Sequence, residues 1–213
     1  MKKIFIAIAA LMFASVNAFA ASLSDLNFGI SGQALYYNAS GTETLKESNN
    51  KTNSDETGIA PIASIFIETE TDAGGAVGVE IIPYDAKLGD GSMSSDDDIE
   101  TAGTNTVDVN LSNFVSFYVE NPMGSNGRFL RLALNHGTLQ TDETVNTGST
   151  YGDEDLTGLT VGVGVKRDRG NGFFKFIAEL SHFQGATFDA TNTNNKITLD
   201  DFQTLGLRAS VGF

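Results

Sequence analysis

Apolar and polar residues alternate with a period of two along most of this chain. That period is typical of strands that turn one face to apolar surroundings and the other to polar ones. In the fourth such segment, one face is predicted to carry Val107, Val109, Leu111, Val115, Phe117 and Val119. Eight strands are predicted in all, over residues 27–37, 59–71, 76–84, 107–119, 129–136, 159–168, 173–183 and 199–213.

The connections between these strands are alternately short and long. Those after the second, fourth and sixth strands are short, at residues 72–75, 121–128 and 169–172, whereas the others are polar and near twenty residues long. Short turns at one end and long loops at the other are typical of transmembrane barrels. We therefore expect an all-β fold, a closed antiparallel up-and-down transmembrane β-barrel. Eight strands are expected, with ten as the alternative because a long connection has room for another hairpin.

The last strand explains how such a barrel would close. Its apolar face carries Leu205, Leu207, Ala209, Val211 and Phe213, and Arg208 and Ser210 lie on its polar face. Because lipid leaves no backbone edge unpaired, this strand is expected to pair with the first one. Aromatic belts are expected at the two membrane interfaces. The candidates are Phe117, Phe129, Phe174 and Phe213 at the short-turn end and Tyr36, Tyr84, Phe183 and Phe202 at the other.

The polar faces of the strands carry charges that a narrow barrel would enclose. These charges are Glu68, Glu80, Arg131, Lys166, Lys175, Glu179 and Arg208. They would line an apolar cavity poorly, which argues against a soluble ligand-carrying barrel. Since an isolated buried ion is costly, we expect a paired lumen network, with Glu68 and Glu80 opposite each other across the 72–75 turn. Such a network is either a structural core or a gate whose pairs rearrange to open a water path.

The first twenty residues are expected to be a signal peptide. Lys2 and Lys3 precede an apolar stretch over residues 4–16, and Ala18-Phe19-Ala20 matches the small-x-small cleavage pattern. The apolar stretch is shorter than the roughly 20 residues of a spanning helix. The remaining residues, 21–213, are expected to form a single barrel domain.

Charge narrows the choice of partners. Of 13 basic residues two lie in residues 1–20, so residues 21–213 hold 11 basic against 27 acidic residues, a net charge of −16. That negative charge argues against nucleic acid as a binding partner. The four long connections carry 18 of the acidic residues, and a divalent cation bound there would bridge to anionic glycolipid. No specific metal site is predicted, because the Asp96-Asp97-Asp98 run lacks the spacing of a calcium loop, and no cofactor motif is present.

The two histidines are the only candidates for hydrolytic chemistry. His136 and His182 end the fifth and seventh strands, where Asp142 or Ser181 would be the nearest partners. Because no nucleophile motif accompanies them, we interpret both as polar rim residues and expect no enzymatic activity.

The chain resembles the small outer-membrane barrels of Gram-negative bacteria, of the OmpA and OmpX type. Leu207, Ala209, Val211 and the final Phe213 resemble the signal that the barrel assembly machinery reads in its clients. A second likeness, over Ile82-Pro83-Tyr84-Asp85-Ala86-Lys87, is to short acidic barrels of marine alphaproteobacteria, and it implies no mechanism.

The resemblance implies an exported monomer in the outer membrane, with both termini periplasmic and the long loops extracellular. Its partners would be outer-membrane lipid, glycolipid and the assembly machinery. The expected function is that of a small structural barrel or a narrow, cation-preferring, porin-like channel. The alternative is a surface binding, adhesion or receptor protein that acts through its acidic loops.

Overall fold

The computed structural model describes residues 26–45, 49–95, 103–144 and 149–213, so the predicted signal peptide and the Asp96-Asp97-Asp98 run lie outside the described residues. The described residues form ten strands: β1 (Leu26–Leu45), β2 (Asn50–Glu70), β3 (Ala76–Ile81), β4 (Ala86–Ser95), β5 (Gly103–Pro122), β6 (Arg128–Thr144), β7 (Glu154–Arg169), β8 (Gly172–Phe183), β9 (Ala186–Asp189) and β10 (Lys196–Gly212). In this part of the chain no helix is long and apolar enough to cross a membrane.

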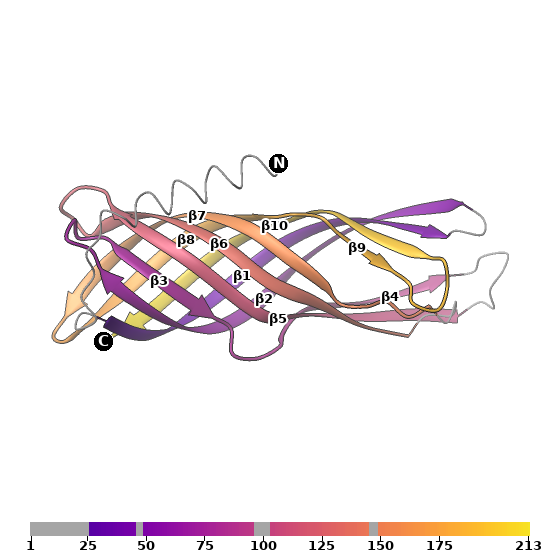
Figure 1. Cartoon of the computed structure of the whole chain (residues 1–213), viewed down its shortest axis with the longest axis horizontal. Coiled ribbons are helices and arrows are strands. Elements are labelled where there is room, and N and C mark those ends of the chain that lie inside the picture. The colour runs from indigo at the N-terminus through magenta and orange to yellow at the C-terminus, as the bar shows by residue number, and fades with distance from the viewer. Residues whose placement is uncertain (1–25, 46–48, 96–102, 145–148) are drawn as a thin grey trace.

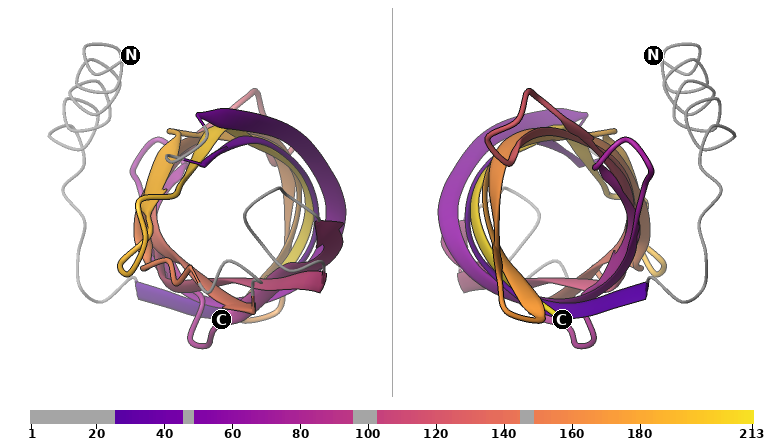
Figure 2. Two further views of the ribbon diagram at one scale, coloured as in Figure 1. Left: turned by 90° about the vertical axis from the view of Figure 1, so that its right-hand side faces the viewer. Right: turned by 90° about the vertical axis from the view of Figure 1, so that its left-hand side faces the viewer.

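The strands form one closed antiparallel cylinder. They pair in the order β1-β2-β3-β5-β6-β7-β8-β10, and β10 returns to pair with β1 (Figures 1 and 2). At the seam between the first and last strands, the backbone N–H groups of Phe28 and Phe213 each donate to the other's carbonyl oxygen, both at 3.0 Å. The predicted barrel and its predicted closure by the last strand are both confirmed.

Ten strands occupy eight positions around this cylinder. Strands β3 and β4 both pair with β5, one beyond the other, and β8 and β9 both pair with β10 in the same way. Residues 82–85 separate β3 from β4 and leave the wall as a small loop (Figure 1). The predicted number of eight strands therefore matches the eight positions around the cylinder. The alternative number of ten matches the ten separate strand segments.

Most strands extend beyond the ranges expected from the sequence. Strand β1 continues to Leu45 instead of residue 37, and β2 begins at Asn50 instead of residue 59. Here both faces of the hairpin are polar, so the period-two signal disappears although the backbone pairing continues. Much of what the sequence indicated as long loops is strand outside the apolar band.

Alternation sets the two faces of the wall over most of its length. Large apolar side chains are exposed on the outer face, among them Phe28, Ile30, Ile59, Ile65, Phe117, Val161, Val163, Phe176, Leu180, Leu205 and Leu207. This exposed apolar surface is the band that a transmembrane barrel turns to lipid.

A bulge in β5 reverses its faces part-way along. The register with β6 shifts between Ser112 and Val115, and Asn113 adopts a positive φ of 50°. Leu111 is therefore buried inside the barrel, whereas Phe117 is exposed on the outer face. The prediction of one continuous apolar face over residues 107–119 is wrong, because the extra residue of a bulge moves every later side chain to the opposite face.

The interior contains an apolar layer toward the long-loop end of the cylinder. It is formed by Leu35, Ala60, Ile62, Ile82, Ala86, Leu88, Leu111, Leu139, Tyr151, Leu156, Phe183, Ala186, Phe188 and Phe202. Phe183 and Phe202 belong to this apolar layer, with ring centroids 5.3 Å apart, and Phe129 is also buried. These three residues were wrongly predicted to lie in the outer aromatic belts, because their burial inside the barrel excludes them from the lipid interface. The polar faces of the strands were expected to line the interior, and this apolar layer was not predicted.

Candidate functional site: the charged layer

Seven charged side chains meet inside the cylinder on the short-turn side of the apolar layer. We call this group the charged layer. Its members are Glu68 of β2, Glu80 of β3, Glu120 of β5, Arg131 of β6, Lys175 and Glu179 of β8, and Arg208 of β10. Each lies in phase with buried neighbours two residues away in its strand, so strand alternation directs all seven inward.

Lys175 and Arg131 hold one half of the charged layer together. The Lys175 Nζ donates to Glu68 Oε1 and Oε2, at 2.7 and 2.6 Å, and to Glu120 Oε2 at 2.5 Å. The other oxygen of Glu120 accepts from Arg131 Nη1 at 3.0 Å. Four strands are thereby linked across the lumen.

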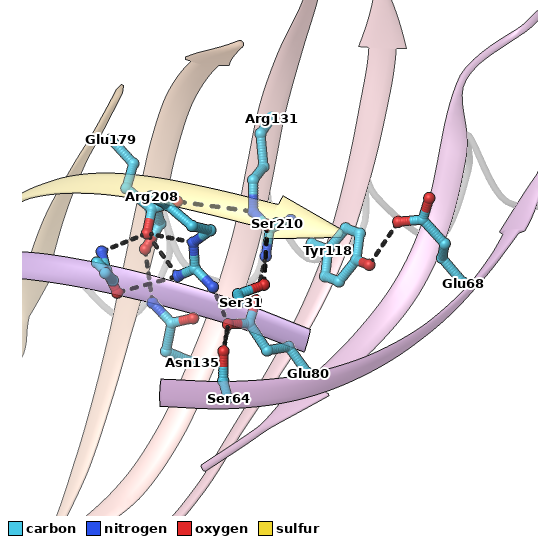
Figure 3. Close-up of polar contacts among 12 residues, drawn as sticks. Ser31, Ser64, Glu68, Glu80, Tyr118, Arg131, Asn135, Glu179, Arg208 and Ser210 are labelled. Atoms are coloured by element: carbon cyan, nitrogen blue, oxygen red, sulfur yellow. Dashed lines mark hydrogen bonds and ion pairs between the residues drawn. The ribbon is translucent and has the colours of Figure 1, made fainter. Parts of the chain in front are cut away.

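Arg131 and Arg208 connect this half to the rest. Arg131 Nη2 donates to Glu80 Oε2 at 2.8 Å, and Arg131 Nε lies 3.8 Å from Glu179 Oε2. Arg208 forms ion pairs with Glu80 and, at 2.6 Å, with Glu179 Oε1 (Figure 3). One continuous chain of ion pairs therefore runs from Glu68 to Glu179.

Neutral side chains complete the polar contacts of the carboxylates. Tyr118 Oη donates to Glu68 Oε2 at 2.7 Å, Ser64 Oγ to Glu80 Oε1 at 2.5 Å, and Gln33 Nε2 to Glu179 Oε1 at 2.7 Å. The guanidinium of Arg131 lies 3.7 Å from the centre of the Tyr118 ring, a cation–π contact. Four carboxylates face three cations, and these hydroxyl and amide donors stabilise the excess negative charge.

Six of the seven charges expected in the lumen are brought together in this charged layer. Lys166 lies apart, where it pairs with Glu70 near the short-turn end and lies 3.6 Å from Asp168. Glu68 and Glu80 do not lie opposite each other, because the hairpin pairs Glu68 with Gly78, and Phe66 with Glu80. That expectation was wrong by two residues in register.

Glu120 of the charged layer and Tyr118, which donates to Glu68, were not predicted from the sequence. Glu120 follows the predicted end of its strand, next to an Asn-Pro dipeptide that indicates a turn. Counting by two from Ser116 places both Tyr118 and Glu120 on the inner face, so the signal was present in the alternation itself.

A cavity of about 40 Å³ lies between the charged layer and the apolar layer. Its polar lining includes Gln33, Ser116, Asn135, Thr160 and Thr204. Since one water molecule needs at least about 10–15 Å³ of such volume, the cavity has room for only a few.

The histidines lie on the outer face. His182 Nδ1 is 3.3 Å from Asp201 Oδ1, whereas Ser181 points inward and shares a 2.7 Å hydrogen bond with Thr160. His182 and Ser181 therefore occupy opposite faces of β8. Among the described residues, no three His, Asp or Glu side chains are grouped in a way that would hold a metal ion.

Solved structures show which fold this is. The chain matches OprG of Pseudomonas aeruginosa with a TM-score of 0.54 at 11% identity, over 88% of this chain and 95% of OprG. The fold is that of a small outer-membrane β-barrel. This agrees with the fold implied by the sequence resemblance, and at such identity the likeness concerns the fold alone.

More distant matches have TM-scores below 0.5. They include the outer membrane protease OmpT of Escherichia coli (0.48, 9% identity, 91% of this chain and 98% of OmpT). Another is Ail, the attachment invasion locus protein of Yersinia pestis (0.37, 14% identity, 87% of this chain and 99% of Ail). No family model matches the sequence, and no curated protein is similar to it in sequence.

Proposed function

We propose that the protein is a structural barrel of the bacterial outer membrane whose interior is closed to ions. The observation that carries this proposal is the filling of the lumen by two stacked layers, one charged and one apolar, with only about 40 Å³ between them. An eight-position barrel is just wide enough for side chains to fill, and strands all around this one contribute buried side chains to the two layers.

The ion pairs support a structural role for the charged layer. Buried charges are tolerated only when paired and hydrogen-bonded, and removal of one partner typically destabilises a protein by about 3–5 kcal/mol. Here each cation contacts at least two carboxylates. A conducting state would require several of these contacts to break together, so a narrow cation-preferring channel is the less favoured function.

A surface binding role is the second candidate, and the extended hairpin of β1 and β2 favours it. Paired backbone continues to Leu45 and Asn50, well beyond the exposed Ile59 of the apolar band, and carries acidic residues such as Glu43 and Asp55. We propose that this end is extracellular and that both termini are periplasmic. No enzymatic function is proposed, because Ser181, the nearest hydroxyl partner considered for His182, lies on the opposite face of β8 and is hydrogen-bonded to Thr160.

Epitope insertion tests the proposed location and orientation. An epitope after Asn192, between β9 and β10, should be detected by antibody on intact cells. The matched insertion after Gly124, in the turn between β5 and β6, should be detected only after the outer membrane is permeabilised. Detection of both epitopes on intact cells, or of neither after permeabilisation, would contradict the proposal.

A further inference from the structure

Three arginines gather on the outer face of the barrel at its short-turn rim. Along β7, Val165 is the last outward apolar residue before Arg167 and Arg169. Arg128 of β6 lies directly opposite Val165, so it shares this outer face. All three arginines are exposed. They therefore lie where the apolar band ends.

Carboxylates do not neutralise these arginines. Residues that lie diagonally across two antiparallel strands are about 7–8 Å apart, so Arg167 is a neighbour of Arg128. Arg167 Nη1 donates to the carbonyl oxygens of Asn126 and Lys166, at 2.6 and 3.1 Å, which holds its side chain over the turn before Arg128. Among the described residues, none of the three arginines forms an ion pair, whereas the nearby Lys166 pairs with Glu70. This part of the rim therefore presents uncompensated positive charge.

An open groove begins beside Arg128 and crosses the outer face. Residues that pair directly on five neighbouring strands follow its course: Arg128, Val165, Phe176, Ala209 and Gly32. Neighbouring strands are about 4.8 Å apart, so these four steps span about 19 Å. The hydrocarbon chains of one leaflet reach about 15 Å, half of a core that is about 30 Å thick. The groove is therefore long enough for one acyl chain.

Small residues form the floor of this groove between larger neighbours. Gly32, Ala178 and Ala209 line it, and a Cβ added at Gly32 would meet nothing within 4 Å. Phe176 and Leu207 stand beside them as ridges, with 59% and 63% of their side chains exposed. A flexible apolar chain makes more van der Waals contacts between such ridges than it would on a flat surface.

The groove and the arginines together match a phospholipid with an anionic headgroup. Arginine binds phosphate through two parallel hydrogen bonds, and basic residues at a membrane surface attract anionic lipids. We propose that the groove is a binding site for an anionic phospholipid of the periplasmic leaflet. Its phosphate would lie at Arg128 and Arg167, and one acyl chain would lie over Ala209 and Gly32. The proposal rests on the proposed orientation, which places the short-turn end in the periplasm.

Tryptophan quenching tests this site, because the chain has no tryptophan of its own. Phe176→Trp would report from the groove, and Phe117→Trp, at a similarly exposed position on β5, would report from outside it. Each variant would be refolded into phosphatidylcholine vesicles that contain a small fraction of lipid with brominated acyl chains. That brominated lipid, which quenches tryptophan on contact, is either phosphatidylglycerol or phosphatidylcholine.

Brominated phosphatidylglycerol should quench Phe176→Trp several-fold more strongly than the same fraction of brominated phosphatidylcholine does. The two lipids should quench Phe117→Trp equally. Equal quenching of Phe176→Trp by the two lipids would overturn the proposal. Weaker quenching of Phe176→Trp than of Phe117→Trp by both lipids would also overturn it, since a second copy of the chain would then cover the groove.

Further substitutions in Phe176→Trp separate the headgroup from the acyl chain. Arg128→Gln should remove most of the preference for phosphatidylglycerol, whereas Lys51→Gln, which removes one charge at the long-loop end, should leave it unchanged. Gly32→Leu fills the open floor of the groove and should weaken the preference although the arginines remain. Equal effects of Arg128→Gln and Lys51→Gln, or a preference that Gly32→Leu does not change, would overturn the proposal.

The quenching measurement does not depend on the orientation of the barrel, because the vesicles present the same lipids to both of its ends. A missing preference for phosphatidylglycerol would therefore overturn the lipid site alone. The epitope insertions test the orientation separately.

Discussion

Arg131 is the residue on which the charged layer depends most. Its guanidinium contacts Glu120, Glu80 and Glu179 and lies over the ring of Tyr118. Without it, three carboxylates would share one small volume with fewer cations. The charge of Arg131 therefore limits carboxylate repulsion, and its planar shape fits several acceptors at once.

Arg131→Met should lower the free energy of unfolding by about 3–5 kcal/mol, because it leaves buried carboxylates uncompensated. The matched variant Lys166→Met removes a partly exposed pair at the short-turn end and should cost about 1 kcal/mol or less. Urea unfolding of both variants in lipid vesicles measures the difference. Equal losses would mean that the charged layer is not a stabilising unit.

Gly78 leaves the space in which Tyr118 lies. A Cβ at residue 78 would be 2.4 Å from the Tyr118 ring, whereas a Cβ at Gly32 meets nothing within 4 Å. Gly78→Ala should therefore displace the ring, weaken its hydrogen bond to Glu68, and cost about 1–3 kcal/mol. Gly32→Ala, the same change in an open position, should be close to neutral in the same unfolding experiment. A neutral Gly78→Ala would show that Tyr118 does not need this position.

At the scale of the element, the bulge of β5 determines which side chains fill the interior. It turns Leu111 into the apolar layer while Ser116 and Glu120 remain on the inner face below it. Two different interior layers therefore arise from one strand. A regular strand would have sent either Leu111 or Glu120 to the lipid.

Deletion of Asn113 should remove the bulge and exchange the inner and outer faces of one part of β5. Because the barrel should then fail to fold, the heat-modifiable band of folded protein should be missing when an unheated sample is run on a gel. Asn113→Gly keeps the positive φ of 50° at no steric cost and should fold like the wild type. Folding of the deletion variant with normal yield would contradict the role given to the bulge.

Alternation alone predicted the strands that cross the apolar band and the inward direction of Glu68, Arg131 and Lys175. It did not predict the reversal at Asn113, because a bulge depends on a backbone conformation that the apolar pattern does not report. It also missed the extensions of β1 and β2. Both faces of these extensions are polar, and backbone pairing instead of burial maintains the strands there.

At the scale of the whole molecule, the interior differs most from the expectation. Six of the seven charges of the charged layer were identified from the sequence, but the apolar layer was not, since Phe183 and Phe202 also suit a membrane interface. Only the three-dimensional closure shows that both rings point inward and meet. The charged layer and the apolar layer together, with little space between them, are what support a closed barrel.

Single-channel recording of refolded residues 21–213 in a planar bilayer tests directly whether the interior is closed to ions. Insertion into lipid would be verified by recovering heat-modifiable barrel from the lipid vesicles in which the protein is refolded. No discrete current steps above the bilayer baseline are expected in potassium chloride. Reproducible, cation-selective steps from the wild type would contradict a closed interior and would favour a gate formed by the charged layer.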